Sequence, residues 1–389
     1  MPFITWLRSV NPDWNLVPAN VLFAERSEKS GAEDVHLTPS QKLGVLPQAE
    51  YVERTGAQVV RNRTGAENMK HVEPGDFISH LRSFQGGLEY SALAGKVSNA
   101  YTVITPRVDL VDGYYRYLFK SSLFIEGLGN ITDQLRDGQT INFARFSQFG
   151  LPLPPLETQR AIADYLDRET AEIDAMSADL DEMEALLTER RDAFVGSAVR
   201  SLRGLFTRAS LQSIAQIHAG DTITAAEIKD QGAYPVYGGN GVRGYIDRFN
   251  ESQDRVLVGR QGALCGNVHL ASGPFFASEH ALVVEPIIEV HPGWLAQVLK
   301  DQNLGQLSMS AAQPGITATG VGMQKIDMPP LDEQRRIADE IDRETDEIDS
   351  MLADITELRD LLAERRAAII AAAVTGQIDI PIHEEATHA

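Results

Sequence analysis

Cysteine is almost absent from this chain, which has one, Cys265, among 389 residues. A single cysteine excludes an internal disulfide framework and a multi-cysteine metal site, and it suits a reducing compartment. We interpret Cys265 as a small buried side chain. The nine histidines show neither an H-E-x-x-H motif nor any other paired-ligand spacing, so we expect no metal site.

Long apolar runs are also missing, since no stretch approaches the ~18 consecutive apolar residues of a membrane-spanning helix. The first ten residues, MPFITWLRSV, lack the charged start and apolar run of a signal peptide. We therefore expect a cytoplasmic protein without a membrane partner. With 43% hydrophobic residues, the chain is long enough for two or three globular domains.

Two motifs that would indicate catalysis are incomplete. Gly239, Gly241 and Gly244 form G-x-G-x-x-G, but the following YIDRF is typical of a strand, whereas a dinucleotide site requires a helix. NPDW, from Asn11, is similar to the Asn-Pro-Pro-aromatic turn of amino-methyltransferases, but Asp13 replaces the second proline and no glycine-rich cofactor strand accompanies it. We expect no catalytic residue and no cofactor on this chain, which argues against a self-sufficient methyltransferase.

One helical segment occurs twice. PPLETQRAIADYLDRETAEIDAM begins at Pro154, and PPLDEQRRIADEIDRETDEIDSM begins 175 residues later at Pro329. The segments that contain the copies, 154–203 and 329–389, carry −16 of the net charge of −20. Segments 1–153 and 204–328 are nearly neutral, so their composition permits a nucleic-acid partner without demonstrating one.

Apolar residues recur every seven positions in both copies, which indicates two heptad seams. The positions expected to pair the helices are Leu166, Ile173, Leu180 and Leu187 in the first copy, and Ile341, Ile348, Ile355 and Leu362 in the second. Met176, Met183, Met351 and Leu358 follow as second heptad positions. Each helix should be about 60 Å long at 1.5 Å per residue.

Most other positions of these helices are charged, so each helix needs a partner helix. A dimerisation coil is one alternative, but two copies in one chain favour pairing within the chain, because the tether raises the effective concentration. Glu169 and Glu344 occupy equivalent positions, as do Arg190 and Arg365. If the helices pair antiparallel, each Glu meets the Arg of the other helix.

Segments 1–153 and 204–328 are rich in glycine, aromatic and β-branched residues, and they predict mixed α/β domains with substantial sheet. GDFISHLRSFQGG from Gly75 faintly resembles DRVLVGRQGALCG from Asp254, and a short alternating run follows each, AYTVITP and ALVVEP. The two segments therefore share a fold in our interpretation and differ in surface.

The whole chain resembles the specificity subunits of type I restriction–modification systems. The PPL-x-x-Q-x-x-I-A opening of each repeat carries this resemblance, with Thr158 where the family usually has Glu. AAAVTGQID from Ala371 is similar to the family's C-terminal signature. LRSFQGG from Leu81 and YPVYGGNGVRGYI from Tyr234 are similar to stretches of its target recognition domains.

The resemblance implies an α+β fold with two mixed α/β target recognition domains, separated by two long antiparallel coiled-coil helices in a pseudo-two-fold tandem repeat. The expected boundaries are 1–153 for the first recognition domain, 154–203 for the first helical spacer, 204–328 for the second recognition domain, 329–376 for the second spacer and 377–389 for a C-terminal tail. The expected partners are double-stranded DNA, two modification subunits that carry S-adenosylmethionine, and optionally two restriction subunits that use ATP and magnesium.

Reading a half-site needs Arg, Asn and Gln side chains at the major-groove edges of bases, on turns that let the backbone approach phosphate. The candidates are Arg82, Ser83 and Gln85 in the first domain, and Asn240, Arg243, Arg260 and Gln261 in the second. A scaffold whose two domains bind protein or carbohydrate remains the alternative. Retention of duplex DNA by the chain, purified together with a methyltransferase partner, distinguishes the two.

Overall fold

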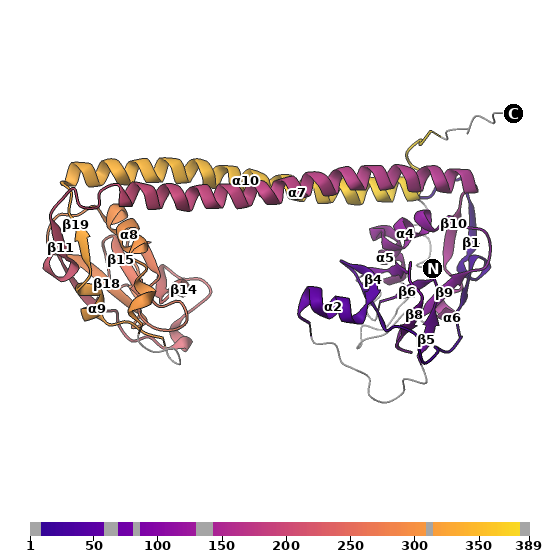
Figure 1. Ribbon diagram of the computed structural model, residues 1–389, viewed down its shortest axis with the longest axis horizontal. Helices are drawn as coiled ribbons and strands as arrows, with labels where there is room; N and C mark the ends of the chain where they lie inside the picture. The colour runs from indigo at the N-terminus through magenta and orange to yellow at the C-terminus, as the bar shows by residue number, and fades with distance from the viewer. Residues whose placement is uncertain (1–8, 58–68, 81–85, 130–142, 309–313, 382–389) are drawn as a thin grey trace. The chain divides into compact units, whose positions relative to one another are not determined.

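The structure is a computed structural model that describes residues 9–57, 69–80, 86–129, 143–308 and 314–381. The chain divides into two compact units, Met1–Leu180 with Glu357–Ala389, and Asp181–Thr356. Each unit contains one mixed α/β domain and part of both long helices, α7 (Leu156–Arg200) and α10 (Leu331–Val374), which lie side by side (Figure 1).

In its described part, the first unit is built on a four-stranded antiparallel sheet. The strand order is β2 (Phe23–Glu25), β9 (Val103–Pro106), β6 (Phe77–Ser79) and β7 (Leu88–Tyr90). Three further antiparallel pairs surround it: β3 (Leu37–Ser40) with β4 (Gly44–Pro47), β5 (Lys70–Val72) with β8 (Gly95–Val97), and β1 (Asn15–Pro18) with β10 (Gly150–Leu153).

The core of the first unit is aromatic and extends into the long helices. It lies between the sheet and α4 (Asp112–Lys120), where Phe23, Phe77 and Phe119 pack mostly edge to face. Leu166 of α7 and Val374 of α10 belong to the same core. The remaining helices are α1 (Ala19–Leu22), α2 (Gln48–Thr55), α5 (Ser122–Gly129) and α6 (Phe143–Phe146).

The second unit repeats this plan in its described part. Its four-stranded antiparallel sheet has the order β12 (Ala215–Ala219), β18 (Ala281–Pro286), β15 (Arg255–Gly259) and β16 (Val268–Ala271). A second sheet has the order β14 (Gly241–Ile246), β13 (Tyr234–Gly238) and β17 (Phe276–Ala277), and β11 (Arg208–Ser210) pairs with β19 (Lys325–Asp327).

The core of the second unit lies between this sheet and α8 (Pro292–Asp301), which Figure 1 shows next to the long helices. Trp294 of α8, Val199 of α7 and Ile341 of α10 are buried together in it. The shorter elements are α9 (Ala318–Gly322) and the 3₁₀ turns η4 (Leu211–Ser213), η5 (Ala225–Glu227) and η6 (Leu304–Leu307).

The faint sequence similarity between the two domains corresponds to equivalent strands. β6 begins within GDFISHLRSFQGG and β15 begins within DRVLVGRQGALCG. Each strand is the third of its four-stranded sheet. The register also matches, because Phe77 faces Ile104 as Val256 faces Val284. The two domains share this sheet, as the sequence predicts.

Ion pairs show that the two long helices run antiparallel within each unit. In the first unit Arg365 pairs with Glu169 at 3.1 Å, and Arg366 pairs with Asp174. In the second unit Arg190 pairs with Glu344 at 3.5 Å, and Arg191 pairs with Asp349 at 3.2 Å. The expected antiparallel arrangement and the expected Glu–Arg partners are therefore both present.

The first heptad positions turn inward along both helices. Leu166, Ile173, Ile341, Ile348 and Ile355 are buried, whereas Leu180, Leu187 and Leu362 are half-buried. The second heptad positions differ from the expectation, because Met176, Met183, Met351 and Leu358 are 37–51% exposed. The second inward-facing row of the seam lies four residues after most of the first positions, at buried Thr170 and half-buried Ser177 for example, so residues three positions on lie at its edge and stay open to solvent.

The glutamine of the PPL-x-x-Q opening joins each domain to its long helix. In the first unit, buried Gln159 accepts the N–H of Val111 at 2.9 Å and donates to the carbonyl of Pro154 at 2.8 Å. In the second unit, buried Gln334 accepts the N–H of His291 at 2.9 Å and donates to the carbonyl of Pro329 at 2.9 Å. Val111 and His291 immediately precede α4 and α8, so one side chain fixes two helix starts in each unit.

The NPDW stretch holds the end of α10 in the first unit. The backbone N–H of Asn11 donates to the carbonyl of Thr375 at 2.7 Å. Gly376 has a φ of +70°, and a Cβ there would lie 2.6 Å from the ring of Trp14, so the contact requires glycine. These contacts give the stretch a structural role.

Candidate nucleic-acid interface

The first domain's candidates, Arg82, Ser83 and Gln85, lie outside the described residues. The described residues on either side of them are His80, which follows β6, and Gly86, which precedes β7. A Cβ on Gly86 would lie 2.5 Å from the amide nitrogen of Gln41 and 2.6 Å from the His80 ring. His80 Nε2 lies 2.7 Å from the Glu89 carboxylate, and Lys120 of α4 pairs with the same carboxylate. Backbone and charged groups are therefore closely packed around His80 and Gly86.

In the second unit, two glycine-containing turns converge and bring three of the four candidates into one region. Asn240 lies in the turn between β13 and β14, and Arg260 and Gln261 follow β15. A Cβ on Gly259 would lie 2.1 Å from the carbonyl oxygen of Gly239, so the two turns pack backbone to backbone. Glycine at both positions is what lets the segments approach this closely.

The four candidates differ in how free their side chains are. Asn240, Arg243 and Gln261 are exposed. Arg260 is half-buried, and its guanidinium donates to the carbonyl of Glu279 at 3.4 Å. Arg243 lies across Gly238, where a Cβ would come within 2.2 Å of the arginine Cδ. The three exposed side chains are thus better placed than Arg260 to meet a ligand.

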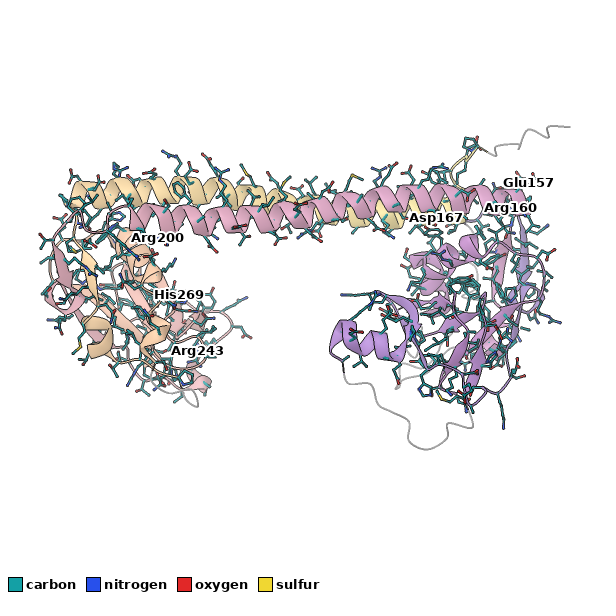
Figure 2. All side chains as sticks on the ribbon, in the orientation of Figure 1. Glu157, Arg160, Asp167, Arg200, Arg243 and His269 are labelled. Atoms are coloured by element: carbon teal, nitrogen blue, oxygen red, sulfur yellow. The ribbon has the colours of Figure 1, made fainter. Side chains whose placement is uncertain are left out.

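The structure adds Asn267 and His269 to this region, which the sequence analysis did not select. The Asn267 side chain donates to the Asn240 side chain at 2.7 Å. The His269 ring packs against Gly241, whose Cβ would lie 3.5 Å from Cε1. Figure 2 shows His269 and Arg243 on the same side of the second unit. The sequence signal for both residues is weak, since they only alternate with Val268 and Leu270.

Among the described residues, no group of three or more His, Cys, Asp and Glu side chains is arranged to hold a metal ion. Cys265 is buried, in agreement with the role expected from the sequence. In the described part of the chain, no helix is both long and apolar enough to span a membrane. The G-x-G-x-x-G sequence falls on the hairpin of β13 and β14, and β14 includes Gly241 and Gly244 and ends at Ile246, so a strand continues over the first two residues of YIDRF and no helix follows.

A second surface lies on the long helices and is apolar. On α7 and α10, three large apolar residues of each unit are exposed by 37–58%: Met176, Leu358 and Leu361 in the first unit, and Met183, Leu186 and Met351 in the second. Each residue has its equivalent 175 positions away in the other repeat. Exposed apolar groups in a row on an otherwise charged helix are typical of a protein-docking surface.

A family model described as the type I restriction modification DNA specificity domain matches residues 61–185 and 206–358. These matches cover more than half of the chain, which therefore belongs to this family. The two-domain α+β architecture with paired long helices is the fold expected from the resemblance.

Two specificity subunits from Escherichia coli are similar to parts of the chain. That of the type I restriction enzyme EcoprrI is 36% identical over 155 residues, which are 39% of this chain and 38% of the relative. That of EcoKI, from strain K12, is 32% identical over 100 residues, 25% of this chain and 21% of the relative. The matches thus span about two fifths and one fifth of the relatives' lengths.

Solved structures share the fold at low sequence identity. A chain from a study titled as the structural basis of complex assembly and conformational transition of the type I R-M system has a TM-score of 0.69 and 16% identity, covering 95% of this chain and 99% of that one. The HsdS subunit from Thermoanaerobacter tengcongensis has a TM-score of 0.55 and 16% identity, covering 95% and 98%.

Proposed function

We propose that this chain is the DNA sequence-specificity subunit of a type I restriction–modification complex, in which each domain reads one half of a bipartite target. The observation that carries the proposal is a shared sheet with different side chains at equivalent positions. For example, Glu89 faces Ile78 in the first sheet as His269 faces Leu257 in the second. Two copies of one fold with different surfaces suit two half-sites of different sequence.

Direct contacts in the second half-site would come from Asn240, Arg243 and Gln261, with Asn267 beside Asn240. Amide and guanidinium groups are the usual partners of adenine and guanine edges in the major groove. In the first half-site we keep Arg82, Ser83 and Gln85 as candidates. The domain boundaries at residues 153, 203, 328 and 376 belong to the same proposal.

We further propose that the paired helices space the two domains and dock two modification subunits. The exposed apolar residues of the helices recur at a separation of 175, so the same partner surface is offered twice. The helical segments carry most of the negative charge, which disfavours non-specific contact with DNA. The modification subunits would supply S-adenosylmethionine and the methyl transfer, and restriction subunits would supply ATP-dependent cleavage.

Methylome mapping tests the proposal. Cells that carry this gene with its modification partner should show N6-methyladenine at one split motif, and cells that lack the gene should not. The purified complex should contain two modification subunits per specificity chain and bind duplex DNA containing that motif. A methylation pattern independent of this gene would refute the proposal, as would tight binding to a protein or glycan with no affinity for DNA.

Exchange of residues 1–153 for the first domain of another family member gives a sharper test. The chimaera should change one half of the methylated motif and keep the other, because the second domain is untouched. A matched exchange of residues 204–328 should change only the other half. If either chimaera altered both halves, the assignment of one half-site to each domain would be wrong.

A further inference from the structure

The two domains differ in charge at one equivalent position, where the sheet meets the neighbouring helix. Glu89 on β7 and His269 on β16 have the same register in the two sheets. Lys120 and Lys300 also correspond, because each lies seven residues after the glycine at the second position of its helix, α4 or α8. The first domain therefore places an acid beside a lysine, and the second places a histidine beside a lysine.

In the first domain this position is neutralised internally. The Glu89 carboxylate is buried, pairs with Lys120 and lies 2.7 Å from Nε2 of buried His80. These three side chains need no further partner.

In the second domain the equivalents of Glu89 and His80 are missing. His269 replaces the acid, and Gly259, the last residue of β15, stands at the position that corresponds to His80. Nε2 of His269 is buried without a hydrogen-bond partner, and among the described residues Lys300 makes no ion pair within 4.0 Å. Desolvation lowers the pKa of His269, and the charge of Lys300 lowers it further. Lys300 is exposed; desolvation and the charge of Arg191 lower its pKa, and the Asp342 carboxylate raises it.

These residues line a cleft of about 650 Å³. Residues 263–268 form one wall, with His269 and Lys300 beside them, and Asn303 and Gly305 complete the lining. The amide groups of Asn267 and Asn303, together with a lysine that makes no ion pair with the described residues, favour an anion. Asn267, which lines the cleft, donates to Asn240, so the cleft adjoins the proposed base-reading residues.

We propose that this cleft, through Lys300 and His269, holds a backbone phosphate of the DNA half-site that the second domain reads. The proposal rests on the proposed function and adds a specific phosphate contact, which the first domain does not make at the equivalent place. Lysine is a compact positive charge with three donors, as suits a single phosphate. Contacts of this kind fix the position of a domain on DNA without reading sequence.

The test uses the complete complex with modification subunits and a duplex that contains the methylated motif. Lys300→Gln should lower affinity and reduce the slope of log K against log salt concentration by about 0.9, the value for one lost phosphate contact. Lys325→Gln is the matched control, because it removes the same charge from the same unit at an exposed position on β19. It should leave the slope unchanged.

Neutral methylphosphonate links, placed one at a time in the half-site, identify the phosphate. One link should weaken the wild-type complex and have no further effect on Lys300→Gln, because both changes remove the same contact. His269→Glu, which copies the first domain, should pair with Lys300 and show the same insensitivity. Its unfolding transition should remain cooperative, which separates loss of contact from loss of fold.

The outcomes separate this inference from the function on which it rests. If the wild-type complex does not bind its motif, the proposed function fails. If it binds normally while both variants keep the wild-type salt slope and methylphosphonate pattern, the phosphate contact is refuted and the function stands. The contact would also be refuted if no methylphosphonate link weakened DNA binding and inorganic phosphate displaced DNA equally well from the wild-type and Lys300→Gln complexes.

Discussion

Arg365 of α10 pairs with Glu169 of α7 at 3.1 Å, and the equivalent Arg190 and Glu344 pair at 3.5 Å in the other unit. Both arginine side chains are more than half exposed. Exposed ion pairs contribute little stability, because water already solvates both charges. Their value here is register, since a helix shifted by one turn would place each Glu away from its Arg.

A double-mutant cycle tests this reading of the pairs. Glu169→Ala, Arg365→Ala and the double variant should give a coupling free energy below about 1 kcal/mol, because the pair is exposed. Urea unfolding of the four proteins measures it. The cycle on Arg190 and Glu344 is the matched control and should agree within error. A coupling above about 2 kcal/mol in either pair would show that the pairs stabilise the fold directly.

Gln159 should matter more for stability than either ion pair. Gln159→Ala leaves the N–H of Val111 and the carbonyl of Pro154 without their partner in a buried place, at a cost of about 1–3 kcal/mol each for an unsatisfied group. We expect a clear loss of unfolding free energy in urea. Gln334→Ala should produce a similar loss, because it breaks the equivalent bonds.

The control for the glutamine variants is Gln231→Ala, which changes an exposed side chain. It should alter the unfolding free energy by no more than about 0.5 kcal/mol. If Gln159→Ala behaved like this control, water would be replacing the side chain, and Gln159 would not be what joins the first domain to α7.

The pH dependence of stability in the first unit should report on His71. Hydrogen bonds to Glu73 and then to Asp34, both at 2.7 Å, raise the pKa of His71. A raised pKa in the folded state means that charged His71 contributes its full stability below about pH 6.5, the usual value for an unfolded histidine. The contribution is then lost as pH rises through the raised pKa.

His71→Gln supplies the comparison. The difference in unfolding free energy between wild type and variant should be largest near pH 5.5 and should shrink as pH rises through the folded-state pKa. Denaturation in urea at several pH values measures it, and NMR titration of the imidazole gives the pKa itself. A pKa at or below 6.5, or a difference that grows with pH, would contradict the prediction.

The sequence predicts the long helices and their antiparallel partners well, because a heptad period is a local signal and the second copy supplies the partner. It does not predict which apolar positions remain open. Met176 and Ile173 both fit a heptad seam, but the packing of the two helices places Ser177, four residues after Ile173, at the seam, and Met176 is left exposed.

The candidate site is less predictable from sequence, because it depends on turns that meet across the fold. Gly239 and Gly259 are 20 positions apart, and nothing local indicates that their backbones touch. The same holds for the hydrogen bond between Asn267 and Asn240. Composition identified Asn240, Arg243 and Gln261 as suitable side chains, but the contact of Arg260 with Glu279 follows only from the three-dimensional arrangement.

Longer helices should widen the gap between the two half-sites if α7 and α10 act as a spacer. Residues 173–179 of α7 and 348–354 of α10 are equivalent heptads of the two repeats. Duplicating both adds seven residues to each helix and keeps the first heptad positions in phase, since the pattern repeats every seven residues. It also leaves Leu166, Val199, Ile341 and Val374 packed in their domain cores. An insertion near Gly196 would be less informative, because neighbouring Val199 belongs to the core of the second unit.

Seven residues lengthen a helix by about 10 Å, which corresponds to about three base pairs at ~3.4 Å per step. If the helices set the distance between the domains, methylome mapping should show both half-sites unchanged and the unread gap widened by two or three positions. Duplicating residues 173–179 alone is the control, because only one helix is then longer and the ion pairs of the two units cannot form together without a bulge. That variant should lose methylation, whereas an unchanged gap at full activity in the doubly extended variant would show that the helices do not set the spacing.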